Sequence, residues 1–403
     1  MSAPPGLAAA TFVNPASRPA ARGIPVLRKG FRPFFLLATL HAGTAIALWV
    51  CVALGTFSLQ SSLGPLWHAH EMLFGYASAV IAGFLLTAVG NWTKRETLVG
   101  APLAGLAALW VAGRIACILP VLPWNLVAWI DGSFLPALAI SIAVPIVRTR
   151  NFRNLVMVFL LLALSAFNIV IHLSARGIVQ GWERRSSIVA VYVVVFLCSL
   201  ISGRVIPMFT RNASGVSTIR TVPLLEGLAL LSLLSTAVCE LFPELPVTPW
   251  VAGAAGILAL VRSVHWGARY SMRTPLLWVL HVGYLWIPAG LLLRWASLFW
   301  PMLPSLPTHA FTVGALGSLT IGMMARVSLG HTGRLLVPSK LAVTAFALVN
   351  LAGLVRVALP LVSMSLWRDA IHVSGTLWSL AALALFIANV RIWVSGRVDG
   401  AQG

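Results

Sequence analysis

Long apolar stretches recur along the whole chain, and they limit what it can fold into. Each runs for roughly 17–28 residues, enough for a helix to cross a hydrocarbon core of about 30 Å. The predicted spans are 33–57, 66–92, 102–119, 124–147, 154–175, 187–208, 223–241, 248–265, 275–300, 307–329, 340–360 and 369–394. Since lipid offers no partners for backbone hydrogen bonds, such stretches must be helical. The sequence predicts an all-α, polytopic membrane bundle of about twelve transmembrane helices.

The composition supports a lipid bilayer as the solvent for most of the surface. Only 9% of the residues are charged and 59% are hydrophobic. A soluble domain carries roughly 25% charged residues, so this chain could not cover a core of its size in water.

The basic residues orient the predicted bundle. With the N-terminus inside, 21 of the 28 Lys and Arg fall on the inner side, and three lie within spans. The other four, on the outer side, are Arg176, Arg184, Arg185 and Arg368. Cytoplasmic loops are enriched in Lys and Arg, so both termini are predicted to be cytoplasmic. Membrane orientation accounts for the net charge of +19, and no basic domain indicates a nucleic-acid partner.

The chain divides into one membrane domain and two tails. Residues 1–32 are basic and contain no acid, which predicts a disordered cytoplasmic tail. The apolar stretch that follows is too long for the roughly 7–15-residue apolar region of a cleaved signal peptide. Residues 33–395 are predicted to form a single transmembrane domain, and residues 396–403 a second cytoplasmic tail.

A short pattern recurs along the chain. Three strings lie at intervals of 120 residues on the second, sixth and tenth predicted spans: Ile81-Ala-Gly, Ile201-Ser-Gly and Ile321-Gly. His70 and Gly75 also have the spacing of His309 and Gly314. A three-fold internal repeat of four helices would produce this pattern. Chance recurrence among glycine-rich membrane helices is the alternative.

Ionisable residues inside a membrane are costly, so each needs a partner or a task. Four histidines fall at a similar depth near the outer face: His68, His70, His172 and His309. Glu71 and Asp131 lie at the same level. On a helix, His68 and His70 would point about 160° apart, so they could not easily bind one metal. They could serve two neighbouring centres, or one could orient a ligand of the other.

Three arginines lie in the outer half of predicted spans: Arg114, Arg294 and Arg356. Imidazoles bind haem iron and arginines pair with propionates, so this set suits haem, with Arg114 and Arg356 as propionate partners. The same histidines would suit copper. We expect Arg294 to extend toward the outer interface.

A lone membrane histidine more often joins helices by a hydrogen bond, which we expect of His41 and His372, and His265 is interfacial. The four cysteines are far apart, which indicates apolar packing and neither a disulfide framework nor a zinc site.

Several long, polar strings resemble the NnrS family, bacterial membrane proteins linked to the response to nitric oxide. They are Gly30-Phe-Arg-Pro-Phe-Phe, Trp67-His-Ala-His-Glu-Met-Leu-Phe-Gly75, Gly83-Phe-Leu-Leu-Thr-Ala-Val-Gly-Asn-Trp92, Gly203-Arg-Val-Ile-Pro-Met-Phe-Thr-Arg-Asn212, Leu280-His-Val-Gly-Tyr-Leu-Trp-Ile-Pro288, His309-Ala-Phe-Thr-Val-Gly314 and Leu329-Gly-His-Thr-Gly-Arg334. The resemblance runs from residue 28 to about residue 395. Gly90 departs from it, because the family pattern has proline there.

The resemblance implies haem b and copper as cofactors, a place in the bacterial inner (cytoplasmic) membrane, and protection against nitrosative stress. It adds His281 and His331 as further haem or metal candidates. Both lie toward the inner side, where they would serve a second centre or be structural.

Two functions follow as hypotheses. The first is a haem–copper protein that binds nitric oxide or iron-nitrosyl species at a periplasm-side centre. As an oxidoreductase it would also need an electron donor, which the sequence does not identify. The second is a transporter or exporter of a small metal or nitrosyl complex, since repeats and intramembrane polar groups are typical of transporters. Against it, no predicted helix is clearly broken at the midplane.

Overall fold

A computed structural model describes residues 23–300 and 305–401, and every regular element in these ranges is a helix. Ten of the helical segments described are long and apolar enough to cross a membrane. They are Phe31–Ala53 (α1), Gly64–Thr93 (η3, α2, η4 and α3), Ala101–Ile118 (α4), Trp124–Arg148 (α5 and α6), Phe152–Ala175 (η5 and α7), Glu183–Ser214 (α8), Pro275–Ala296 (α11), Leu306–His331 (α12, η8 and α13), Lys340–Val362 (α14) and Met364–Val394 (η9 and α15). The predicted polytopic helical bundle is confirmed.

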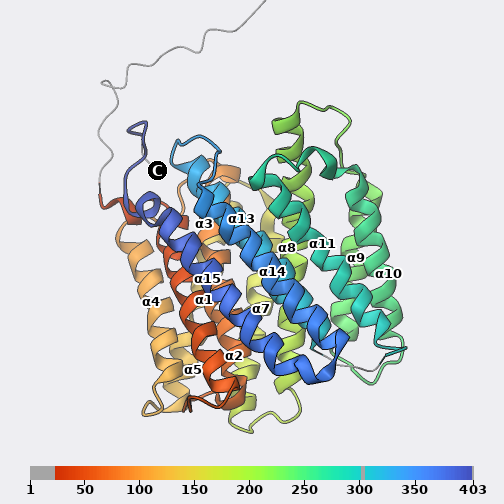
Figure 1. The fold of residues 1–403 in the computed structure, drawn as a ribbon. Coiled ribbons are helices and arrows are strands. Elements are labelled where there is room, and N and C mark those ends of the chain that lie inside the picture. Colours follow the sequence, from red (N-terminus) through yellow and green to blue (C-terminus); the bar gives the residue numbers. More distant parts are fainter. Residues whose placement is uncertain (1–22, 301–304, 402–403) are drawn as a thin grey trace, which may run out of the picture.

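Two shorter helices occupy the places of the seventh and eighth predicted spans. They are α9 (Pro223–Cys239, 17 residues) and α10 (Thr248–Ser263, 16 residues). At 1.5 Å per residue each is about 25 Å long, somewhat less than the hydrocarbon core. They pack against each other and against α8 and α11 at one side of the bundle (Figure 1). With them, each of the twelve predicted spans corresponds to a helical segment.

The two described ends of the chain meet at one end of the bundle. Arg32 is fully buried in the first turn of α1. Its Nη1 donates to the carbonyls of Ile392, Trp393 and Ser395, at 2.9, 3.1 and 2.5 Å, where α15 ends. The C-terminal segment returns over α13, because the amide of Val398 donates to the carbonyl of Thr332 at 3.2 Å.

The predicted disordered tail over 1–32 is therefore wrong at its C-terminal end. Pro25–Leu27 forms a short 3₁₀ helix (η2), and α1 already begins at Phe31. The apolar and aromatic residues at the start of α1 can be buried only if this turn joins the bundle. Residues 1–22 lie outside the described part of the chain.

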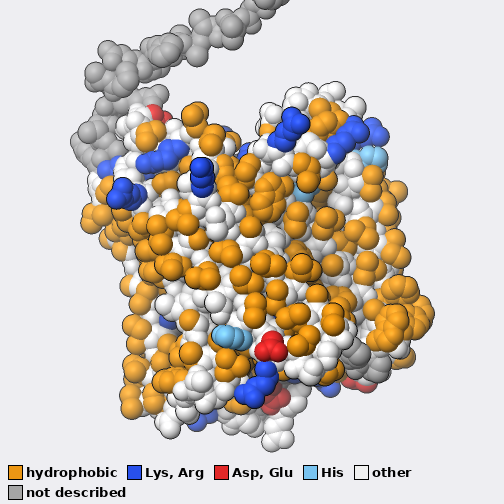
Figure 2. Space-filling model, viewed as in Figure 1, with side chains coloured by type: hydrophobic (Ala, Val, Ile, Leu, Met, Phe, Trp, Pro, Cys, Tyr) orange, Lys and Arg blue, Asp and Glu red, His pale blue; other side chains and the backbone are white. Residues whose placement is uncertain are grey.

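The surface of the bundle is divided by polarity. Figure 2 shows hydrophobic side chains over the middle of one face, with Lys and Arg gathered mainly at the end where the C-terminus lies. This is the end that the charge pattern assigns to the cytoplasm.

Two spans contain a π-helical segment at matching places. In the second span, α2 (Trp67–His70) leads into the π-helix η4 (Glu71–Ala77) and then α3 (Ser78–Thr93). In the tenth, α12 (Leu306–His309) leads into the π-helix η8 (Ala310–Leu316) and then α13 (Gly317–His331).

Each of the three elements in the tenth span begins 239 residues after its counterpart in the second span. The next helices match in the same way, since α14 begins at Lys340, 239 residues after Ala101 at the start of α4. The helices around the N-terminus and those around the C-terminus thus form matching four-helix units. In the middle unit, α8 is α-helical throughout.

Candidate functional site

The four outer histidines lie in two different sites. His70 and His172 belong to a buried network of charged and polar side chains, and His68 and His309 line a cavity. His68 and His70 were predicted to point in different directions from one helix, and they do lie in different sites. π-Helical segments are rare and are frequently found at functional sites, and each of these two sites lies beside one.

The buried network, called here the charged cluster, is centred on Asp131. This residue lies in α5 (Trp124–Gly132) and is 2% exposed. Its Oδ2 lies 3.0 Å from His70 Nε2 and 2.9 Å from His172 Nε2, and it accepts from Asn168 Nδ2 at 2.8 Å. Three polar contacts therefore converge on one buried carboxylate oxygen.

Arg114 joins Asp131 to a second buried carboxylate. Its Nη1 donates to Glu71 Oε1 at 3.0 Å, and its Nη2 pairs with Asp131 Oδ1. His70 Nδ1 lies 3.0 Å from Glu71 Oε1, and His41 Nε2 lies 3.2 Å from Glu71 Oε2. Burying these charges is tolerable because each faces an opposite charge or a hydrogen-bonding partner.

This pairing changes the interpretation of Arg114. The sequence suggested Arg114 as a partner for a haem propionate, but both terminal nitrogens of its guanidinium face carboxylates of the protein. The close approach also depends on Gly75, since a Cβ there would collide with His41 Nε2 and lie 3.0 Å from Arg114 Nη1.

The charged cluster has a donor set that could hold a metal ion. Within the described ranges, one group of His, Cys, Asp and Glu side chains meets this condition, with ligand atoms all within 4.8 Å of one another: His70, Cys117, Asp131 and His172. All four residues are buried. Imidazole, carboxylate and thiolate together suit zinc or copper more than magnesium or calcium.

Three members of the charged cluster were missed from the sequence. Cys117 was predicted only to pack, although it lies three residues after Arg114 on the same helix face. Asn168 precedes His172 by four residues, which also places the two on one face. His41 was expected to be an ordinary hydrogen bonder between helices, and its partner proves to be Glu71.

The second site is a cavity of about 190 Å³ whose lining includes His68, His309 and Arg356 and which we call the histidine cavity. The His68 ring stacks on Trp49, with ring centroids 4.5 Å apart and an interplanar angle of 10°. His309 Nδ1 lies 2.8 Å from the carbonyl oxygen of Ser305. That carbonyl can only accept, so Nδ1 carries the proton and the Nε2 lone pair is left for a metal or another donor.

Arg356 is the charged group of the histidine cavity. It is 6% exposed, and its guanidinium lies over the Trp367 ring, 4.2 Å from the centroid. Its Nη1 is buried and has no hydrogen-bond partner within the described structure. A buried donor without a partner costs free energy, so this atom is suited to an acceptor group supplied by a ligand.

A larger space of about 930 Å³, here called the outer vestibule, adjoins the histidine cavity. The two share Ile188, Val191 and Thr308 in their linings. Arg294, which was expected to extend toward the interface, lines the vestibule and donates from Nε to Glu240 Oε1 at 2.7 Å.

The two inner histidine candidates lie outside both sites. His281 is 7% exposed, and its Nε2 lies 3.0 Å from Thr210 Oγ1 on α8. His331 Nε2 lies 3.4 Å from Asn91 Nδ2, and its ring lies 6.0 Å from that of Phe31. Such contacts join helices. The surroundings of His281 and His331 therefore favour a structural role over metal or haem binding.

Comparison with known proteins adds one finding. The family model described as NnrS protein matches residues 25–397, nearly the whole chain. No curated protein matches the chain.

Proposed function

The chain belongs to the NnrS family, and from this premise we propose that it binds haem b and copper at its outer end and acts on nitric oxide there. Membership makes it a multi-pass membrane protein of the nitric oxide response. We further propose that the membrane is the bacterial inner membrane, with the two sites toward the periplasm. The charge bias of the sequence supports this orientation.

The observation that carries the haem proposal is the chemistry of the histidine cavity. His309 has an Nε2 lone pair for a metal, His68 lies against Trp49 in the same lining, and Arg356 Nη1 has no partner. Aromatic walls, imidazoles and a buried guanidinium are the groups that hold haem and its propionates.

Size also bears on the haem proposal. The cavity alone is smaller than the roughly 300–1,000 Å³ of typical organic-ligand sites, but the outer vestibule adjoins it. In this proposal haem would use both spaces, with the side chains between them moving aside.

In this proposal His68 and His309 hold the iron, and Arg356 pairs with a propionate. When bound, haem would supply an iron that can take nitric oxide in place of one of these two imidazoles. The protein's own part is to fix the tautomer of His309 through Ser305, to orient His68 by stacking, and to exclude water with apolar and aromatic walls.

We place copper in the charged cluster, because that site has ligands but no enclosed space of the kind that haem needs. His70, His172, Asp131 and Cys117 would be the ligands, and Glu71, Arg114 and Asn168 would orient them. We extend the proposal to oxidoreductase activity on nitric oxide, which would require an electron donor outside this chain. Measuring nitric oxide turnover with a supplied electron donor tests this extension.

A transporter or exporter is the second candidate. The matching helical segments and the adjoining vestibule and cavity favour it, since transporters place substrate sites between repeats. It predicts flux of a metal or nitrosyl complex into proteoliposomes, lost in His309→Ala while bound chromophore is retained.

The experiment is an optical spectrum with metal analysis of protein purified from cells supplied with haem and copper. We expect His309→Ala and His68→Ala to lose or shift the Soret band and to keep copper. His172→Ala should lose copper and keep the Soret band, and His281→Ala is the matched control that keeps both. A colourless, metal-free wild-type protein would overturn the proposal.

A further inference from the structure

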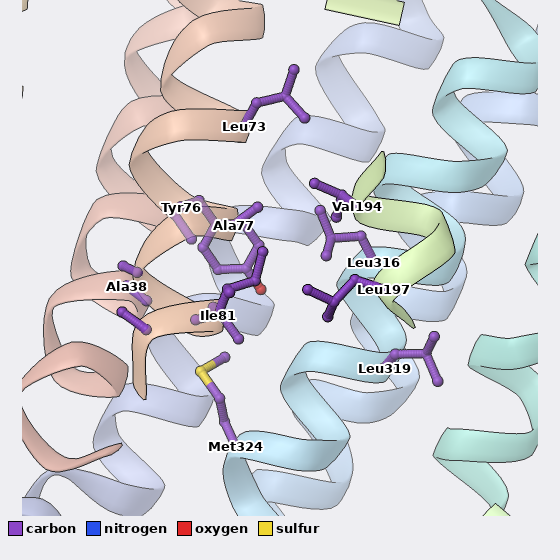
Figure 3. Close-up of a cluster of buried hydrophobic side chains, with 14 of the residues drawn as sticks. Ala38, Leu73, Tyr76, Ala77, Ile81, Val194, Leu197, Leu316, Leu319 and Met324 are labelled. Atoms are coloured by element: carbon purple, nitrogen blue, oxygen red, sulfur yellow. The ribbon is translucent and has the colours of Figure 1, made fainter. Parts of the chain in front are cut away.

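An apolar pocket of about 60 Å³ lies beneath the histidine cavity, between the three helices that carry the repeated sequence pattern. Its lining comes mainly from α3, α8 and the η8–α13 segment. Figure 3 shows side chains from these helices gathered in one cluster, among them Ile81, Leu197 and Leu316. We call this space the central apolar pocket.

The pocket lies where the three helices that carry the repeated pattern meet. The 239-residue shift carries three of its lining residues on α3 onto three on α13: Val80 onto Leu319, Ile81 onto Thr320 and Phe84 onto Met323. On α8, Ile201 lies 120 residues after Ile81 and also lines the pocket. Corresponding faces of α3 and α13 therefore meet here, with α8 beside them.

The pocket is chemically suited to an apolar occupant. Its most polar groups are Cys198, Ser202 and Thr320. The Thr320 hydroxyl is already engaged, since it donates to the Leu316 carbonyl at 2.6 Å and lies 2.6 Å from the Tyr76 hydroxyl. A buried water needs two to four polar partners, whereas apolar cavities stay dry and take xenon or small apolar molecules. A cavity needs roughly 10–15 Å³ of this kind of volume to hold one water molecule, so the space is large enough for a diatomic molecule.

One residue connects this pocket to the histidine cavity. Leu316, the last residue of the π-helix η8, is in the lining of both. Four lining side chains keep partial exposure: Phe84, Cys198, Val205 and Met323. They lie near the middle of their spans, where the surrounding solvent is hydrocarbon.

We propose that the central apolar pocket is a docking site for a small uncharged gas, which passes Leu316 to reach the histidine cavity. Identifying that gas as nitric oxide rests on the proposed function. Nitric oxide is neutral and apolar, so it dissolves in lipid and needs no polar path. Nitric oxide would then reach the histidine cavity from the lipid and not through the outer vestibule, whose lining includes arginines.

The first test is a structure of the full chain in lipid nanodiscs determined under xenon pressure, since xenon reports apolar cavities without any cofactor. We expect xenon between Ile81, Leu197 and Leu319. An ordered lipid chain, hydrogen-bonded water or xenon found only elsewhere would overturn the docking site. Because xenon needs no haem, this test stands even if the protein proves colourless and the proposed function fails.

The second test asks whether the pocket is on the route. Ser202→Leu fills it, and Met208→Leu, on an exposed position of the same helix, is the matched control. After photolysis of the haem–carbon monoxide complex, we expect rebinding to slow several-fold in Ser202→Leu, to quicken in Leu316→Ala and to be unchanged in the control. If Ser202→Leu does not fold, Cys198→Leu replaces it. Loss of xenon without a change in rebinding would refute the route.

Discussion

The first and third four-helix units share a backbone plan but hold opposite chemistry. His70 and His309 occupy the same place, each the last residue before a π-helix. At the other positions of the charged cluster that a shift of 239 residues can reach, the third unit has different residues. They are Leu280 for His41, Ala310 for Glu71, Gly353 for Arg114, Arg356 for Cys117 and Ala370 for Asp131.

The exchange gives the two sites different chemistry. Around His70, two carboxylates and an arginine form ion pairs with one another, although Glu71 Oε2 and Arg114 Nε lack a hydrogen-bond partner in the described structure. Around His309 the corresponding charges are absent, a cavity lies beside the ring, and Arg356 has a donor without a partner. A buried polar group costs free energy unless it is paired, so the first unit is built for rigidity and the third for a ligand.

The largest difference should appear when the arginine is removed from each unit. Arg114→Met leaves Glu71 and Asp131 buried without their shared cation, and breaking a buried ion pair in this way costs about 3–5 kcal/mol. Arg356→Met removes a group whose Nη1 has no partner, so we expect a loss of about 1 kcal/mol or less in the free energy of unfolding. Reversible unfolding in bicelles, measured on metal-free protein, compares the two.

Equal losses in the two variants would contradict this contrast between the two sites. The control is Arg176→Met, which removes an exposed arginine from an outer loop. It should change the free energy of unfolding by no more than about 0.5 kcal/mol.

The glycines of the two π-helices offer a second comparison. A Cβ at Gly75 would meet the tip of the His41 ring, whereas a Cβ at Gly314 would meet the base of the Trp286 indole. The backbone is also close there, since a Cβ at Gly353 would lie 3.1 Å from the Cα of Gly314. The tip of a side chain can move aside more easily than a packed indole or a backbone. We expect about 1–3 kcal/mol of destabilisation from overpacking, with Gly314→Ala above Gly75→Ala, in the same unfolding assay.

A second readout separates these two variants. Gly75→Ala should disturb copper binding and leave the haem spectrum unchanged, and Gly314→Ala should do the reverse. A variant that affects both groups equally would show that the two sites are not independent.

Copper affinity tests whether the charged cluster is organised around Asp131. Asn168→Ala removes a donor that holds Asp131 Oδ2 at 2.8 Å, without removing a proposed ligand. Losing such an orienting partner typically costs 10–100-fold in metal affinity, or about 1.4–2.7 kcal/mol. Titration against a copper chelator measures the change, and an unaltered Soret band is the internal control. Unchanged copper affinity would place the metal elsewhere.

The sequence predicted the fold well because hydrophobic length and charge bias act locally along the chain. Its helix boundaries were less accurate, most of all for α8, which was predicted over 187–208 and runs over Glu183–Ser214. At Arg32 the start of α1 depends on packing, because its guanidinium pairs with carbonyls some 360 residues away. The depth of the four outer histidines and the divergence of His68 from His70 were also readable, since both follow from position along and around one helix.

What the sequence could not supply was the partner of each polar residue. Arg114 and Arg356 look alike by depth and neighbours in the chain, yet one faces two carboxylates and the other a cavity. That difference arises from contacts between helices. The π-helices could not be predicted either, because one extra residue per turn does not change the pattern of an apolar sequence.

The smallest expected effect concerns a hydrogen bond that joins the two units near the central apolar pocket. The Tyr76 hydroxyl, on η4, lies 2.6 Å from Thr320 Oγ1, on α13. In Tyr76→Phe the Thr320 hydroxyl still donates to the Leu316 carbonyl, so no donor is stranded, and the loss should be about 0.5–1.5 kcal/mol.

A double-mutant cycle with Thr320→Val isolates this contact. If the two units are coupled mainly through it, the interaction free energy should equal most of the loss in Tyr76→Phe alone. A value near zero would mean that the units hold together by apolar packing around Ile81 and Leu316. The cavity and the charged cluster could then be altered separately without weakening the junction between them.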